Sequence, residues 1–475
     1  MSTKAYTGQL PIFAIPLAAA LFLAFGIGPN AALALLACVA LVAGLLLLWR
    51  PGEPPILLFV FLYQWMQSSI GIFYANWKDI PLEYFMFHPG AHDQAVALCL
   101  IGLVVLGIGL RIGAGRQDLN FSRAASATVF STPYAAFVKL FMAVWVFSAA
   151  CHLLAQAIPG ASQLLLALAS FKWAAFVVLT YATFVRPDGS FTIWLAVFLI
   201  EFFSALGGYF SSFKDVFVFT LIALGAAQVR VSPRQAVLGG LLVGAFVFVG
   251  VIWTAIKTDY RHFVRGDSTA QVVTVDFGTA VAKLGELAVD LDAAEIGSSV
   301  DQLFRRIMYT EFFGATLTYV PHVVPHENGA LWADALIRPV TPRFLFPDKA
   351  IIDESLLTNA YTGLGVSGMD QGTQITIGYM GEAYIDFGHL GMFAPILLVG
   401  LAMGRIYRWI LTGPRSYGIA GLGLAPVVLM AASYLEMSSA KVIGGLFAQS
   451  LAVWLLISFV LPRYLPWALP RQSRV

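Results

Sequence analysis

The sequence predicts an all-α polytopic membrane protein, on the evidence of its composition, its long apolar runs and one late polar segment. Of its 475 residues, 59% are hydrophobic and 11% are charged, whereas an average soluble domain carries about a quarter charged residues. The 28 Lys and Arg nearly balance the 26 Asp and Glu, with a formal net charge of +2. No bulk positive field is therefore present to attract nucleic acid.

The apolar runs predict about twelve transmembrane helices, because roughly 20 apolar residues are needed to cross a hydrocarbon core about 30 Å thick. More runs of this length follow the first one, so we interpret the first as a span and not as a cleavable signal. We place the spans at 11–27, 30–49, 54–76, 93–111, 133–156, 160–185, 191–209, 212–229, 235–256, 386–408, 416–434 and 442–461.

The distribution of Lys and Arg predicts that both termini are cytoplasmic. If the N-terminus is inside, the turns on that side hold most of the arginines, and the short outer turns around Pro29 and Pro159 hold almost no cations. Such a bias marks the cytoplasmic side of a polytopic membrane protein. The inside arginines include Arg50, Arg111, Arg116, Arg186, Arg230, Arg405 and Arg463.

This topology divides the chain into three parts. A transmembrane bundle of about nine spans occupies 1–256, a polar segment occupies 257–385, and spans with a cytoplasmic tail occupy 386–475. The polar segment, between spans nine and ten, shows helical amphipathic spacing from Gly278 to Tyr319 and loops from Pro321 onward. A long periplasmic loop domain of this kind predicts that the function is carried out at the outer face of the membrane.

Basic side chains near the outer ends of spans are candidates for an anion site, because a partly buried cation is costly without compensation. Lys214 follows a Gly- and Ser-rich hairpin, where it either snorkels to water, pairs with Asp215 or faces a bound anion. Arg261 and Arg265 are four residues apart and share a helix face. Asp259 and Asp267 are alternative partners for these two arginines.

The polar segment holds further candidate cations. Arg305 and Arg306 point about 100° apart on a helix, so one of them at most faces a given site, and Glu311 is available as a partner. Arg343 and Lys349 lie in a loop that prolines stiffen. Arg is suited to a forked grip on phosphate and Lys to a point-charge contact.

Candidate bases lie at the start of the next span and in the outer loop. Glu382, Tyr384 and Asp386 lie at the mouth of that span, where a carboxylate either acts as a base or pairs with an arginine. We take Glu382 as the first choice of base and His326 as the second. No spacing of His, Cys, Asp or Glu predicts a metal site, and no nucleotide-binding motif is present.

Three charges lie within or beside the spans themselves. Glu201 is intramembrane, and it either pairs with Lys214 across the hairpin or marks an ion path. Glu436 and Lys441 flank the last outer turn, and we expect them to pair with each other.

Three segments of residues 200–395 resemble a known family. The segments "GGYFSSFKD" (207–215), "PRFLFPDK" (342–349) and "GEAYIDFGHLG" (381–391), together with the late outer loop, resemble the Wzy-type O-antigen and exopolysaccharide repeat-unit polymerases, which are related in architecture to O-antigen ligases. Lys214 stands where an arginine is frequent in that family, so a point-charge contact with phosphate is expected at this position.

The resemblance implies a metal-independent membrane glycosyltransferase with no cofactor. Its donor and acceptor would be undecaprenyl-diphosphate-linked oligosaccharides, joined at the periplasmic face with release of undecaprenyl diphosphate. A flippase and a chain-length regulator commonly accompany this family. The expected site comprises Lys214, Arg261, Arg265, Arg305, Arg343, Lys349 and Tyr384 for the diphosphate or substrate, and Glu382 or His326 as the base. The alternatives are a ligase that transfers a finished glycan, and a transporter of polysaccharide or lipid.

Overall fold

The computed structural model describes residues 10–50, 52–115, 121–158, 161–206, 214–228, 233–266, 274–341, 346, 349, 352–369 and 373–468. All regular elements within these ranges are helices, which confirms the predicted all-α class. Seven of the described helices are long and apolar enough to cross a membrane, and three shorter ones are also apolar. The seven are Ala31–Leu48, Ile56–Trp77, His92–Ala114, Tyr134–Ala155, Leu164–Val185, Phe393–Thr412 and Ser439–Tyr464.

Five of the twelve predicted spans are not among these seven, and three of the five correspond to described helices shorter than the roughly 20 residues that a crossing needs. Helix α10 (Phe191–Leu206) has 16 residues, α11 (Lys214–Ala227) has 14 and α20 (Ile419–Met430) has 12. The described parts of α10 and α11 adjoin residues 207–213, which the structure does not describe, so the full number of spans stays a prediction.

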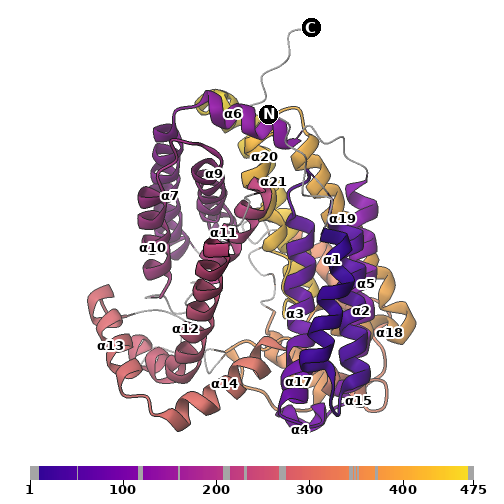
Figure 1. The fold of residues 1–475 in the computed structure, drawn as a ribbon. Coiled ribbons are helices and arrows are strands. Elements are labelled where there is room, and N and C mark those ends of the chain that lie inside the picture. The colour runs from indigo at the N-terminus through magenta and orange to yellow at the C-terminus, as the bar shows by residue number, and fades with distance from the viewer. Residues whose placement is uncertain are drawn as a thin grey trace.

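One group of helices pairs through glycine. This group lies on the right in Figure 1, and its members are α1 (Leu10–Leu21), α2 (Ala31–Leu48), α3 (Ile56–Trp77), α5 (His92–Ala114) and α19 (Phe393–Thr412). Helices α5 and α19 pack closely because Gly109 and Gly113 face Gly400 and Gly404. A Cβ at Gly113 would lie 2.3 Å from the Leu401 carbonyl oxygen. Glycines spaced four apart on both helices allow this approach of the two backbones.

A second group of helices lies on the left in Figure 1 and is joined to the first through α20. Helix α20 contacts both α9 and α3, so it lies between the two groups. Helices α21 (Ser439–Leu455) and α22 (Leu461–Tyr464) follow it in the chain. The second group comprises α7 (Tyr134–Ala157), α8 (Ser162–Ala169), α9 (Phe171–Val185), α10, α11 and α12 (Pro233–Arg265).

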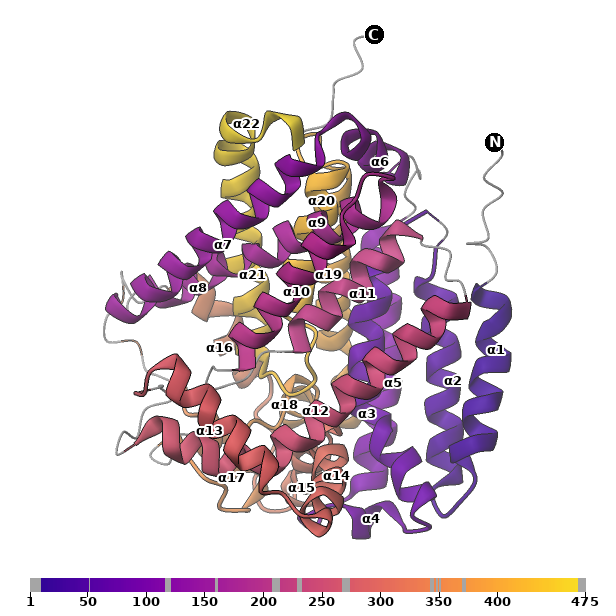
Figure 2. The same ribbon diagram turned by 60° about the vertical axis from the view of Figure 1, so that its left-hand side comes forward.

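The helices of the polar segment gather at one end of the molecule, opposite α6 (Phe121–Ser131) and α22 (Figures 1 and 2). We call this end, with α4 and α13 to α17, the lower end. Its helices are α4 (Leu82–Phe85), α13 (Phe277–Val289), α14 (Ala293–Ile307), α15 (Glu311–Tyr319), α16 (Ala330–Ile337) and α17 (Glu354–Thr362). Helix α18 (Tyr379–Gly391) then leads back to α19.

The helices predicted between Gly278 and Tyr319 are present, with two breaks. Asp292 starts α14 through a capping box with Glu295, and a second break precedes Glu311. The predicted segment boundaries fall inside helices, because α12 continues through 256–257 and α18 through 385–386. Helix α12 therefore carries its last two turns directly into the lower end, where α14 packs against it.

Candidate functional site

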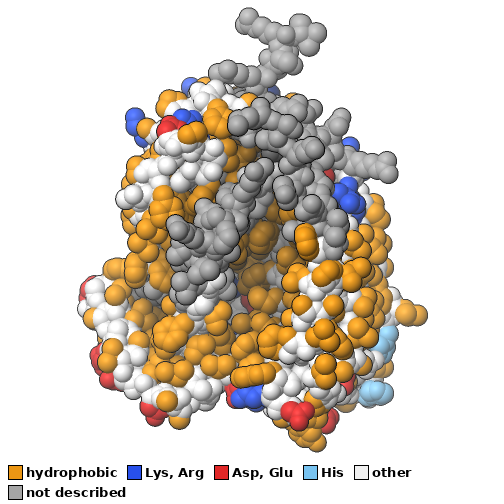
Figure 3. Space-filling view, in the orientation of Figure 1, with side chains coloured by type: hydrophobic (Ala, Val, Ile, Leu, Met, Phe, Trp, Pro, Cys, Tyr) orange, Lys and Arg blue, Asp and Glu red, His pale blue; other side chains and the backbone are white. Residues whose placement is uncertain are grey.

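A cavity of about 310 Å³ lies at the lower end, between α12, α14 and the segment that leads into α5. Its wall includes Lys257 from α12 and both Arg305 and Arg306 from α14. The expectation that at most one of these two arginines faces a given site was therefore wrong, because both side chains reach the same cavity. Lys and Arg side chains are visible over α14 in the space-filling view of Figure 3. Helix α13 lies between α12 and α14 in the chain, but α12 and α14 contact each other, so Lys257 lies near the two arginines.

The cations of this cavity are close enough to oppose one another. Burial, with the positive charges of Arg306 and Arg261, lowers the pKa of Lys257 to about 8. Such crowding of like charges costs free energy unless an anion is bound. Among the described residues, none of Lys257, Arg305 and Arg306 forms a salt bridge.

The guanidinium group of Arg305 packs against two aromatic rings. Its guanidinium carbon lies 4.6 Å from the centre of the Phe87 ring and 5.1 Å from that of Phe85. Its Nε is buried and has no hydrogen-bond partner in the described part of the chain. Asp301, whose charge also acts on Arg305, forms a salt bridge of 3.1 Å with Lys78. Arg305 therefore retains hydrogen-bonding capacity for a ligand in the cavity.

A histidine and a glutamate complete the wall. His88 Nδ1 lies 2.8 Å from Glu311 Oε1, and the His88 backbone N–H donates to the same oxygen over 2.7 Å. Glu311 was predicted as the partner of an arginine on α14, and this prediction was wrong because the carboxylate pairs with His88. Our sequence reasoning missed His88 and Lys257. A row of cations at Lys257, Arg261 and Arg265, each four apart, was the available signal for Lys257.

Three residues predicted for the anion site lie in or near the cavity. Arg305 lines the cavity, as predicted for an anion site. Arg261 lies one helical turn beyond Lys257, and its positive charge helps to lower the pKa of Lys257. Arg265 lies one turn further along α12.

Lys214 lies elsewhere, at the first residue of α11. Its Nζ donates to the Tyr63 hydroxyl over 3.3 Å and lies 4.7 Å from the centre of the Tyr434 ring. It does not pair with Glu201, as one prediction had it, because Glu201 is bound to Lys172 at 2.7 Å. The aromatic contacts stabilise the ammonium group, and the negative charges of Glu436 and Asp215 add to this stabilisation.

The Pro-rich loop contributes no side chain to the cavity among the residues described. Lys349 Nζ donates to the carbonyl oxygens of Arg338 and Thr341 over 2.6 and 2.9 Å. It thereby satisfies the carbonyl groups that follow α16. Arg343 lies outside the residues that the structure describes.

The predicted bases hold α18 in place. Glu382 is buried, and its Oε2 accepts hydrogen bonds from the backbone N–H and the hydroxyl of Ser439 over 2.8 and 2.5 Å. His326 Nδ1 donates to the Ile385 carbonyl oxygen over 3.0 Å, and the Tyr384 hydroxyl donates to the Val320 carbonyl oxygen over 2.8 Å. None of Glu382, His326 and Tyr384 lines the cavity.

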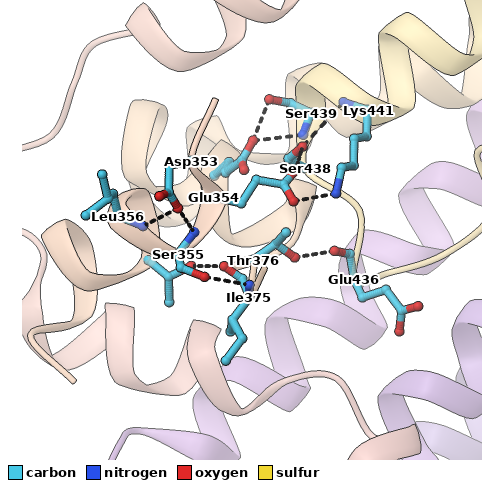
Figure 4. A network of polar contacts seen from close by, with 12 residues as sticks. Asp353, Glu354, Ser355, Leu356, Ile375, Thr376, Glu436, Ser438, Ser439 and Lys441 are labelled. Carbon is cyan, nitrogen blue, oxygen red and sulfur yellow. Dashed lines mark hydrogen bonds and ion pairs between the residues drawn. The ribbon is translucent and has the colours of Figure 1, made fainter. Parts of the chain in front are cut away.

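Figure 4 shows the polar network at the start of α21. Ser438 donates to Glu354 Oε1 over 2.7 Å, and Lys441 forms an ion pair with the other oxygen of Glu354. The expected pair of Glu436 with Lys441 was therefore wrong, and Glu436 accepts a hydrogen bond from Gln67 over 3.0 Å instead. Carboxylates at a helix N-terminus are favourably placed, so this network fixes α17 to the start of α21.

Residues 102–411 match a family described as a domain of unknown function (DUF8712). The chain belongs to this family. The DUF8712 region begins within α5 and ends within α19, the two helices that pair through glycine. It includes Lys257, Arg305 and Glu311, whereas His88 precedes it. The chain matches no curated protein and no solved structure.

Proposed function

We propose that this membrane protein is a metal-independent glycosyltransferase that joins undecaprenyl-diphosphate-linked oligosaccharide repeat units. The observation that supports this proposal is the cavity in which Lys257, Arg305 and Arg306 converge without a salt bridge. A diphosphate carries the negative charge that such a group of cations accommodates, and Arg binds its oxygens in a forked geometry. The lipid-linked substrate fits a chain rich in apolar helices that cross or enter a bilayer.

The cations would act on the leaving group. Negative charge develops on the diphosphate as the glycosidic bond breaks, and fixed cations stabilise that charge where water is scarce. Each charge-assisted hydrogen bond contributes about 1.5–3 kcal/mol. Three contacts would therefore supply several kcal/mol toward cleavage.

The proposal includes a location. With about twelve spans and both termini cytoplasmic, the lower end would face the periplasm of a bacterial cell, at the outer surface of the inner membrane. The lipid-linked donor and acceptor would enter laterally from the bilayer. A flippase would supply them, and a chain-length regulator would act on the product.

The test is turnover by purified protein in lipid nanodiscs, with an undecaprenyl-diphosphate-linked oligosaccharide as the only sugar substrate. We expect a ladder of products from the native protein and its loss in an Arg305→Ala/Arg306→Ala double variant. Lys283→Ala is the matched control, because Lys283 is a cation at the same end that pairs with Glu286 and does not line the cavity.

Each alternative activity has its own signature in this assay. Transfer of a single glycan to an added lipid A-core or protein acceptor, without a ladder, would identify a ligase. Movement of substrate across the bilayer with no covalent product would identify a transporter. A full ladder from the double variant would exclude the cavity as the diphosphate site.

A further inference from the structure

His88 lines the cavity, and one of its two ring nitrogens is engaged by Glu311. Its Nδ1 lies 2.8 Å from Glu311 Oε1, and a carboxylate oxygen accepts hydrogen bonds, so Nδ1 carries the proton. Nε2 of the neutral ring is then an acceptor, and it has no hydrogen-bond partner among the described residues. The side chain is 36% exposed and lines the cavity. Its free acceptor is thus accessible to a molecule bound there.

Three hydrogen bonds to His88, and a fourth beside it, hold this histidine in position. Glu311 begins α15, is largely buried and accepts both the ring N–H and the backbone N–H of His88. His92, buried in the first turn of α5, donates from Nε2 to the His88 carbonyl oxygen over 2.8 Å. The Ala91 N–H donates to the Gly314 carbonyl oxygen over 3.0 Å. A base whose orientation is fixed by a carboxylate and by the backbone is arranged for proton transfer.

The cations and the histidine open onto the same space. Lys257 comes from α12 and the arginines Arg305 and Arg306 from α14, while the Phe312 ring of α15 lies 5.9 Å from the His88 ring. A diphosphate held by the cations would therefore have its sugar close to Nε2.

We infer that His88 is the general base of the proposed glycosyl transfer and that Glu311 is its positioning residue. This inference rests on the proposed function. His88 Nε2 accepts the proton of the acceptor hydroxyl as that oxygen forms a bond to the anomeric carbon of the donor. The bond from the anomeric carbon to the phosphate oxygen breaks, and its electron pair leaves with undecaprenyl diphosphate. The imidazolium then passes its proton to the released diphosphate or to water, which balances the reaction.

The first test is His88→Gln, which keeps a polar side chain of similar reach but cannot take a proton. We expect kcat/KM to fall about 100- to 10,000-fold, the usual contribution of a general base, with undecaprenyl diphosphate binding unchanged. His322→Gln is the matched control, since His322 is exposed in the loop after α15 and does not line the cavity. It should retain native turnover.

The pH profile separates a catalytic from a structural role. The native rate should fall in the acid range, because a protonated imidazole cannot accept a proton. His88→Gln should lose this acid limb, although Glu311, His92, Lys257, Arg305 and Arg306 all remain around the site. Glu311→Gln should lower kcat with less effect on KM, because Gln still accepts from Nδ1 but lacks the charge that stabilises an imidazolium.

The outcomes distinguish this inference from the proposed function. No ladder and no undecaprenyl diphosphate binding by native protein would overturn both. A native ladder with an unaltered rate and acid limb in His88→Gln would overturn only the role of His88. Loss of binding in folded His88→Gln would likewise assign it to substrate binding. If this variant does not fold, modification of the native protein with diethyl pyrocarbonate supports the inference when His88 modification abolishes turnover and opposes it when turnover persists.

Discussion

At the scale of single residues, the side chain that most determines the behaviour of the cavity is Lys257. Arg305 and Arg306 stay charged at all ordinary pH values, whereas a lysine in this setting does not. Its pKa is lowered to about 8 by burial and by Arg306 and Arg261. The cavity therefore loses positive charge as the pH rises through about 8.

This predicts a pH-dependent affinity for anions. Binding of inorganic pyrophosphate, measured by isothermal titration calorimetry, should weaken between pH 7 and pH 9 in native protein more than in Lys257→Arg, which keeps its charge. The comparison cancels the titration of pyrophosphate itself, because both proteins bind the same probe. Parallel pH dependences in the two proteins would contradict a role for Lys257 in the site.

The residues of the site could be predicted only in part, for a physical reason. Arg261 was found because cations four residues apart on a helix form a local pattern, and Arg305 because it lies on an amphipathic helix. His88 carries no such pattern, since its partner Glu311 is 223 residues away in the chain. Partner choice failed for the same reason at Glu201, which binds Lys172 on a neighbouring helix and not the nearer candidate Lys214.

At the scale of helices, the start of α21 is fixed by carboxylates from two other elements. Glu382 of α18 and Glu354 of α17 both accept hydrogen bonds from its first residues. Burial raises the pKa of Glu382 from 4.5 to about 7, with smaller contributions from Glu354 and Asp386. The fold thus favours the protonated form of this carboxyl group.

The sign of the resulting pH dependence follows directly. A raised carboxyl pKa means that stability falls as pH rises from about 4.5 to about 7 and is constant above. The difference corresponds to about 3 kcal/mol. Glu382→Gln imitates the protonated form, so its melting temperature in detergent should exceed that of native protein at pH 8 and change less between pH 5 and 7. Glu286→Gln, at an exposed site, should follow the native curve, and a lower melting temperature for Glu382→Gln at pH 8 would contradict this account.

The pairing of α5 with α19 gives a prediction about packing. In Gly404→Ala, the added Cβ would lie 2.3 Å from the Leu110 carbonyl oxygen, which is backbone and cannot rotate away. Overpacking of this kind costs about 1–3 kcal/mol. Gly244→Ala on α12 is the matched control, because no atom lies within 4 Å of its added Cβ. Thermal unfolding should separate the two variants, and equal melting temperatures would show that the α5–α19 contact can relax.

At the scale of the whole molecule, the polar segment and α6 with α22 occupy opposite ends (Figures 1 and 2). The predicted orientation assigns the lower end to the periplasm. Each end offers an exposed residue at which a label can be attached. Val289 is 84% exposed at the end of α13, and Asp188 is exposed between α9 and α10. The three native cysteines are buried and can be replaced by alanine.

Single-cysteine variants test this orientation. Val289→Cys should react with a membrane-impermeant maleimide in intact spheroplasts, and Asp188→Cys only after permeabilisation. The reverse pattern would place the cavity at the cytoplasmic face, where a periplasmic polymerisation could not take place.

The overall class was the most predictable property. Apolar runs are local, so the helical membrane class follows from Ala31–Leu48 or His92–Ala114 read alone. The bounds of α20 were not predictable in this way, because hydropathy marks an apolar run and not the residues at which a helix begins and ends. The glycine pairing of α5 with α19 needed both helices to be considered together.

The distance along the chain between His88 and Glu311 has a consequence for biogenesis. The ribosome delivers α1 to α11 to the membrane before α15 exists, so a half-inserted nascent chain would hold His88 without its carboxylate partner. On the proposed role of His88, the site would become complete only after α15 has been translated. If His88 acts as proposed, a protein built in this order would not present a competent site to the lipid pool during its insertion.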